Sequence, residues 1–268
     1  LKKSFISDYI QLSFLSNSIK NLEIKFNALK GNYSPNLNYI LYRSGYKEYN
    51  WYNPNLKNQE VFSLLTEISY KDIIKLTGEY ASINNYTFFR ELTNALNGEM
   101  DLYRKVVPNQ IESEIKYLKI KLFSKVDLGN FSFVNTGQYQ QKDQEIVIDG
   151  LATLNVPEWI TRNTLMYSKN VFNNSLYIQT GITFNYFTKF YADYYNPLLS
   201  DFVTQNYKEI GNYPRFDFFF NAKIQQTRVF IKVEHLNSSF TGYDFYSDIF
   251  NPYRDLSVRF GLVWNFFQ

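Results

Sequence analysis

Apolar and polar residues alternate with a period of two along the whole chain. In the segment 22–28, Leu22, Ile24 and Phe26 share one face, while Glu23 and Lys25 share the other. The same alternation recurs in segments that begin near residues 62, 74, 118, 176, 216 and 229. Successive side chains of a β-strand point to opposite faces, so each segment is predicted to be a strand with one apolar and one polar face.

The connections between these segments are alternately short and long. The segments run for about 10 to 14 residues, closer to membrane-spanning strands than to the strands of soluble proteins. Short connections are expected at 16–18, 71–72, 127–130, 170–174 and 225–227. Long connections are expected at roughly 29–57, 87–113, 142–157, 193–213 and 238–255. This asymmetry is typical of outer-membrane barrels, which have tight periplasmic turns and extended extracellular loops.

A soluble β-sandwich would show the same alternation, with the apolar faces turned inward. A sandwich gives no reason for every second connection to be long, and the mixed charges of the polar faces suit a water-filled lumen. No apolar run is long enough for a transmembrane helix, so a chain that spans a membrane must close into a barrel. We therefore expect an all-β fold: an antiparallel transmembrane β-barrel of the bacterial outer membrane, with residues 1–268 as a single domain.

The charge balance and the lack of cysteine narrow the possible functions. With 28 Lys and Arg against 25 Asp and Glu, the chain has no basic stripe of the kind that binds nucleic acid. Without cysteine it has neither disulfides nor a thiolate metal site. No nucleic-acid partner and no cofactor are expected.

The C-terminal segment LSVRFGLVWNFF is predicted to be the closing strand of the barrel. Its inward face is expected to include Ser257, Arg259 and Gly261. Its lipid face is expected to consist of Val258, Phe260, Leu262, Trp264 and Phe266. Aromatic residues at a C-terminus are similar to the signal that barrel-assembly machinery recognises, which makes that machinery an expected partner during biogenesis. Outer-membrane lipid and other envelope proteins are the remaining expected partners.

The number of predicted strands, about eleven, is odd. Single-chain bacterial barrels have an even number of strands with both termini in the periplasm. The sequence begins at Leu1, without an initiator Met or a signal peptide. We therefore expect this chain to be the C-terminal part of a larger barrel, unless one strand has been miscounted.

Several segments resemble those of one family. They are LYIQTGITFNYFTKFYADYYNPLLSDF, IGNYPRFDFFFNAKIQQTRVFIKVEHLNSSFTG and NPYRDLSVRFGLVWNFF, with LNYILYRSGYKEYNWYN and LNVPEWITRNTLMYS upstream. They resemble the putative porin family of Bacteroidota outer membranes, and its flavobacterial members in particular. The resemblance implies an outer-membrane barrel that acts as a diffusion channel. Family members are longer than this chain, which again implies a missing N-terminal part.

The charged residues of the polar faces are the candidate pore-lining residues. They are Lys75, Glu79, Lys119, Lys121, Arg215, Asp217, Lys223, Lys232, Glu234 and Arg259. Such residues set the potential and hydration of a channel. Equally, they could form cross-strand ion pairs that fill a narrow barrel. The basic members Lys119, Lys121, Lys223, Lys232 and Arg259 indicate a mild preference for anions.

Catalytic signatures are almost absent. The single histidine, His235, continues the phase of Val229, Ile231 and Val233, which predicts a lipid-facing position and a structural role. Asp217 and Glu234 could face each other across neighbouring strands, but lumen carboxylates usually pair with Lys or Arg. Neither a catalytic nor a metal-binding residue is expected, and an enzyme of the barrel-protease or barrel-lipase kind is disfavoured.

Two functions remain. The first is an outer-membrane, porin-like channel for the diffusion of small hydrophilic solutes. The alternative is a non-transporting barrel subunit of a larger outer-membrane complex, which would suit a chain that supplies only part of a barrel.

Overall fold

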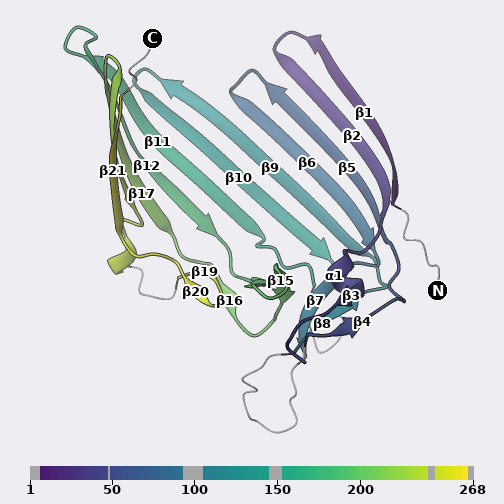
Figure 1. The fold of residues 1–268 in the computed structure, drawn as a ribbon. Coiled ribbons are helices and arrows are strands. Elements are labelled where there is room, and N and C mark those ends of the chain that lie inside the picture. Colours follow the sequence, from purple (N-terminus) through teal and green to yellow (C-terminus); the bar gives the residue numbers. More distant parts are fainter. Residues whose placement is uncertain (1–6, 48, 93–104, 145–152, 241–244, 265–268) are drawn as a thin grey trace.

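Eleven long strands form one antiparallel sheet in the computed structural model, which describes residues 7–47, 49–92, 105–144, 153–240 and 245–264 (Figure 1). Each strand pairs with the next long strand of the chain. In sheet order they are β1 (Asp8–Ile19), β2 (Leu22–Tyr33), β5 (Gln59–Tyr70), β6 (Ile74–Asn84), β9 (Ile115–Leu128), β10 (Phe131–Asp143), β11 (Trp159–Val171), β12 (Leu176–Phe187), β17 (Arg215–Ile224), β18 (Thr227–Glu234) and β21 (Ser257–Trp264). The predicted all-β fold and strand number are confirmed.

The short connections are tight turns that use left-handed backbone conformations. Asn21, Lys71, Asn173 and Gln225 have φ values of 65°, 49°, 53° and 50°. Asn tolerates this region well, and such φ values are what two-residue hairpin turns require. The first turn was wrongly placed at 16–18. β1 continues to Ile19, and the chain reverses at Asn21, where the left-handed conformation is available.

The long connections contain secondary structure of their own, and together we call their described residues the loop layer: 34–47, 49–58, 85–92, 105–114, 144, 153–158, 188–214, 235–240 and 245–256. Most of the layer gathers at one end of the sheet (Figure 1). Its elements are α1 (Leu37–Ile40), β3 (Leu41–Tyr42), β4 (Trp51–Tyr52), β7 (Thr87–Leu92), β8 (Lys105–Gln110), β13 (Phe190–Tyr191), β14 (Tyr194–Asn196), β15 (Asp201–Thr204), β16 (Glu209–Ile210), η2 (Ser238–Phe240), β19 (Tyr246–Asp248) and β20 (Asn251–Pro252).

A second sheet ties separate long connections together within the loop layer. Its order is β14-β15-β7-β8, and β15 pairs in parallel with β7, although their connections are far apart in the sequence. The main hydrophobic core of the described residues lies here and not against the large sheet. It includes Phe89, Val106, Leu199, Val203 and Ile249, which are almost completely buried.

The two faces of the large sheet differ in both chemistry and exposure. One face carries the apolar side chains, and they are exposed: Phe260 is 82 % and Leu165 54 % exposed. The other face carries the charges, and two of its acidic side chains are well shielded, with exposures of 13 % for Asp217 and 10 % for Glu234. The sheet is curved (Figure 1). Side chains on the inside of a curved sheet shield one another, so the shielded charges lie on the concave face and the exposed apolar residues lie on the convex face. A soluble sandwich would bury the apolar face instead.

The sheet is open among the described residues. β1 pairs only with β2, and β21 pairs only with β18, so both are edge strands. No helix in the described part of the chain is long and apolar enough to cross a membrane.

Candidate functional site

The strand register places all ten candidate pore-lining residues on the concave face. Paired residues of adjacent strands point to the same side of a sheet. The pairs Glu67↔Thr77, Thr77↔Lys121 and Glu79↔Lys119 align the first half of the sheet, and Lys232↔Arg259 aligns the last two strands. The charged phase is therefore continuous from β2 to β21.

Ion pairs occupy one end of this charged face. Glu67 on β5 accepts from Lys75 on β6 at 2.7 Å and from Lys25 on β2 at 3.5 Å. Glu79 on β6 pairs with Lys119 on β9. Lys25 and Glu67 were not among the candidates, although the period-2 pattern places both on the polar face and could have identified them.

A second cluster surrounds Glu234 on β18, among the last strands in the order of the sheet. Its carboxylate binds Lys232 at 2.6 Å, Arg254 at 3.0 Å and Arg259 at 3.1 Å. The neighbouring Asp217 lies 3.7 Å from Arg215, accepts from the amide of Asn185 at 3.3 Å, and accepts from the backbone N–H of His235 at 2.9 Å. The two carboxylates are thus bound to basic groups and amides, and do not form a hydrolytic pair.

Basic residues outnumber acidic ones on the concave face. The basic residues are Lys25, Lys75, Lys119, Lys121, Lys125, Lys142, Arg162, Arg215, Lys223, Arg228, Lys232 and Arg259. The acidic residues are Glu23, Glu67, Glu79, Asp127, Asp217 and Glu234. Lys121 and Lys223 have no ion-pair partner among the described residues, so their charges are left uncompensated.

The convex face of the closing strand is apolar. Val258, Phe260, Leu262 and Trp264 lie on it and are exposed, whereas Arg259 lies on the concave face. Phe266, the fifth residue of the predicted lipid face, lies outside the described residues.

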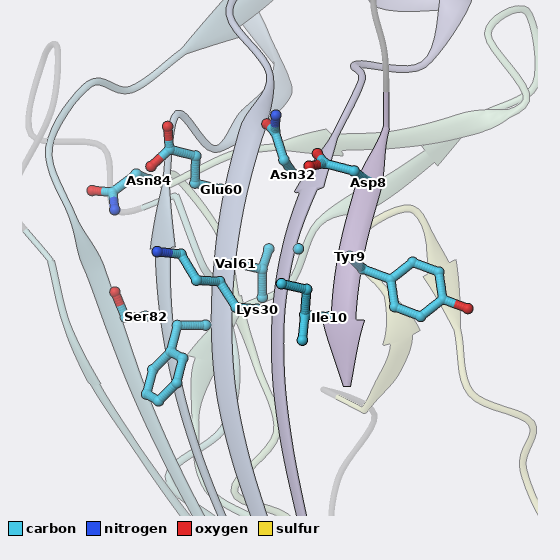
Figure 2. Close-up of a pocket in the computed structure, with 11 residues that line it drawn as sticks. Asp8, Tyr9, Ile10, Lys30, Asn32, Glu60, Val61, Ser82 and Asn84 are labelled. Atoms are coloured by element: carbon cyan, nitrogen blue, oxygen red, sulfur yellow. The ribbon is translucent and has the colours of Figure 1, made fainter. Parts of the chain in front are cut away.

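At the loop end of β1, β2, β5 and β6, the convex face changes from apolar to polar. A cavity of about 550 Å³ lies there. Figure 2 shows Asp8 beside Asn32 and Glu60 beside Asn84, while Tyr9 points away from them. These polar groups follow Phe62 along the convex face of the sheet. The strands are therefore longer than the apolar band that they carry.

His235 does not face lipid, and that prediction was wrong. β18 ends at Glu234, and His235 takes a φ of 53°, which breaks the alternation and turns the ring into the loop layer. The side chain is completely buried, with Phe245 at 4.4 Å and Tyr213 at 6.5 Å between ring centroids. Its Nδ1 lies 2.9 Å from the carbonyl oxygen of Arg254.

A second cavity, of about 540 Å³, lies inside the loop layer. All five long connections contribute to its lining, through residues such as Tyr39, Tyr86, Asn155, Asp193 and Ser247. No pattern in the sequence indicates this cavity, because its residues are brought together only by the pairing and packing of separate loops. Within the described residues, no group of His, Cys, Asp or Glu is arranged to hold a metal ion.

Comparison with known families identifies the chain. The family described as putative porin matches residues 2–268. The chain belongs to the putative porin family. The all-β fold of this putative porin, with its exposed apolar face, is that of an outer-membrane β-barrel protein.

Solved structures with the same fold are outer-membrane receptors. The siderophore receptor PirA from Acinetobacter baumannii is 12% identical, with a TM-score of 0.60 over 95% of this chain and 40% of PirA. The ferric enterobactin receptor PfeA from Pseudomonas aeruginosa, solved as a mutant with enterobactin, is 14% identical, with a TM-score of 0.56 over 90% of this chain and 36% of the receptor. The porin chain thus spans about two fifths of the length of these receptors. No curated protein sequence matches it.

Proposed function

We propose that the protein forms part of the wall of an outer-membrane channel, through which small hydrophilic solutes diffuse with a preference for anions. The observation that supports this most strongly is the excess of Lys and Arg on the concave face. In a barrel this face lines the lumen, where fixed charges set the local potential and the concentration of counter-ions.

We attribute the preference for anions to the basic residues that have no ion-pair partner among the described residues, Lys121 and Lys223. Most charges near Glu67 and Glu234 are neutralised by ion pairs, so their contribution to the field is largely local. Lys121 lies on β9 opposite Thr77 and Gln138, and Lys223 lies on β17 opposite Tyr177 and Arg228. Their positive charges remain available to an anion that passes along the lumen.

We also propose that further strands complete the barrel. Each edge strand would otherwise expose a row of unpaired backbone groups to hydrocarbon, which costs several kcal/mol per group. Outer-membrane lipid would then contact the convex face, and barrel-assembly machinery would insert the protein. Hydrogen exchange on the full-length protein tests closure: the β1 amides that point away from β2 should be protected, and rapid exchange at these amides would contradict it.

Ion current through planar lipid bilayers tests the channel directly. The full-length protein should produce stepwise conductance increases on insertion. Insertion without any current would contradict the channel and would favour the alternative, a non-transporting barrel subunit of a larger complex. We assign no enzymatic role, because the candidate carboxylates are held in ion pairs and the imidazole of His235 is enclosed by aromatic rings.

A further inference from the structure

The cavity of the loop layer is built separately from the charged face of the sheet. Its walls come from residues before β5, from Tyr86 and β7, from the connection after β10, from the long connection that contains β13 to β16, and from Ser247 on β19. A pocket assembled from every long connection requires all of them to fold together. Its volume, about 540 Å³, suits a small organic molecule.

Six of the thirteen described residues that line this cavity are aromatic. They are Tyr39, Tyr86, Phe88, Phe187, Phe190 and Phe202. Several are held in place by other rings: Tyr39 lies 4.4 Å from Phe89 between centroids, and Phe187 packs edge-on against Phe190 at 5.9 Å. Tyr39, Phe187 and Phe190 are thus held against the core of the loop layer.

Two carboxylates line the same cavity, and no Lys or Arg is among the lining residues that the structure describes. Asp193 is half-buried; it accepts a hydrogen bond from the amide of Asn155 at 3.1 Å and another from the side chain of Thr204. Asp201 accepts from the backbone N–H of Phe202 at 2.8 Å. Burial, together with the negative charges of Asp193 and Asp201, raises the pKa of Tyr86 to about 12, so both carboxylates act on the interior of the cavity.

Two basic side chains near the cavity are hydrogen-bonded to backbone carbonyls. Lys142, whose charge lowers the pKa of Asp193, donates to the carbonyl oxygen of Leu154 at 2.6 Å. Lys208 lies over the ring of Tyr246 at 3.3 Å and donates to the carbonyl oxygen of Ile249 at 3.2 Å. The described lining of the cavity therefore combines aromatic rings with two carboxylates and contains no basic side chain.

We infer that the loop layer of this protein binds a small organic cation, such as a quaternary or protonated amine, between the aromatic rings and the carboxylates of Asp193 and Asp201. Cations are attracted to aromatic faces, and aromatic cages recognise quaternary ammonium groups. A neutral saccharide could donate hydroxyl hydrogen bonds to these carboxylates but would leave their negative charge unneutralised, whereas a cation neutralises it. An anion would be repelled by both carboxylates.

Calorimetric titration of the full-length protein with choline tests this inference, with 3,3-dimethylbutan-1-ol as a neutral probe of the same shape. Choline should bind, and the neutral alcohol should bind at least tenfold more weakly. Asp193→Asn and Asp201→Asn should each weaken choline binding at least tenfold. Asp143→Asn removes an exposed charge outside the cavity and should leave binding unchanged.

The variants also guard against a trivial loss of structure. Asn is nearly isosteric with Asp, and a neutral group is favoured at a buried position, so Asp193→Asn should retain the folded loop layer. Equal binding of choline and its neutral analogue, or unchanged choline binding in both cavity variants, would overturn the inference. So would a complete lack of choline binding by the folded protein. Because the cavity lies in the loop layer, these results do not depend on whether the barrel conducts ions.

Discussion

Tyr139 and Trp159 are direct partners on β10 and β11, and their ring centroids lie 4.8 Å apart on the convex face. A second pair on the same two strands, Phe131 and Tyr167, lies at the turn end with centroids 5.1 Å apart. The eight residue steps from Phe131 to Tyr139 span about 26 Å of strand. With a strand tilt of about 40°, this length corresponds to a height of about 20 Å along the barrel axis. Outer-membrane barrels have an apolar band of about 25 Å between two aromatic girdles, which is a similar height.

We predict that Trp159 and Trp264 contact lipid and that Trp51 does not. Both Trp159 and Trp264 lie exposed on the convex face, at opposite ends of the sheet, whereas Trp51 packs against Phe89 in the loop layer. In single-tryptophan variants reconstituted in brominated lipid, the fluorescence of Trp159 and of Trp264 should be strongly quenched. Trp51 is the internal control, and quenching of Trp51 as strong as that of the other two would show that the band has been misplaced.

Gly181 should tolerate a methyl group poorly. A Cβ atom there would clash with the carbonyl oxygen of Leu165 and would lie 2.8 Å from the ring of Phe219. Since the backbone cannot yield easily, Gly181→Ala should lower the free energy of unfolding by about 1–3 kcal/mol. Gly137→Ala on β10 is the matched control, because nothing lies within 4 Å of its Cβ position. Equal unfolding free energies for the two variants in detergent would contradict this packing.

Phe89 should determine the stability of the loop layer. It is completely buried and contacts Tyr39 and Trp51. Phe89→Ala should destabilise the layer by about 3–5 kcal/mol, as expected for a truncated core aromatic residue. Phe240→Ala removes a ring that is 87% exposed in the same layer and should change stability by about 0.5 kcal/mol or less. Denaturant unfolding followed by Trp51 fluorescence measures both; a similar effect of the two substitutions would argue against a separate core.

Asp193 should make the loop layer less stable as the pH rises. Burial raises the pKa of this carboxyl to about 6, against hydrogen bonds from Asn155 and Thr204 that lower it. An unfolded Asp titrates near about 3.9, so the folded state binds more protons between about pH 4 and 6, and stability falls with rising pH across that window. The full pKa shift corresponds to a loss of at most about 3 kcal/mol in the free energy of unfolding, and solvent screening in the cavity reduces this value.

The variant Asp193→Asn isolates this effect from the other carboxyls. The difference in unfolding free energy between wild type and variant should change between pH 4 and 6 and become constant above about pH 7. Parallel stability curves for the two proteins over the whole range would show that Asp193 titrates normally.

The sheet could be predicted from the sequence because period-2 alternation follows directly from strand geometry. Within each strand, the alternation of polar and apolar residues was enough to assign the charged candidates, such as Lys119 and Lys121, to the polar face. The same reasoning misplaced His235, because the left-handed conformation of this residue ends the alternation. No pattern in the sequence KVEHLN predicts at which residue this happens. The first turn shows a different error. The polar run at 16–18 suggested a turn, but the chain reverses at Asn21, which adopts the left-handed conformation.

The loop layer could not be predicted at all. Parallel pairing of β15 with β7 joins Val203 to Phe89, residues from different connections, and nothing in either segment specifies the other. The proximity of Asp193 and Asn155 likewise depends on the way three-dimensional packing brings loops together. Local patterns determine which strands form, whereas contacts between distant loops depend on the whole assembly.

The ion selectivity of the full-length protein tests the central claim most directly. In planar bilayers with a KCl gradient, the reversal potential should show a preference for anions. The double variant Lys121→Glu and Lys223→Glu should shift the reversal potential toward cations, whereas Lys169→Glu, on the convex face, should not shift it. A cation-selective wild type, or a reversal potential that is identical in all three proteins, would contradict a lumen lined by this face.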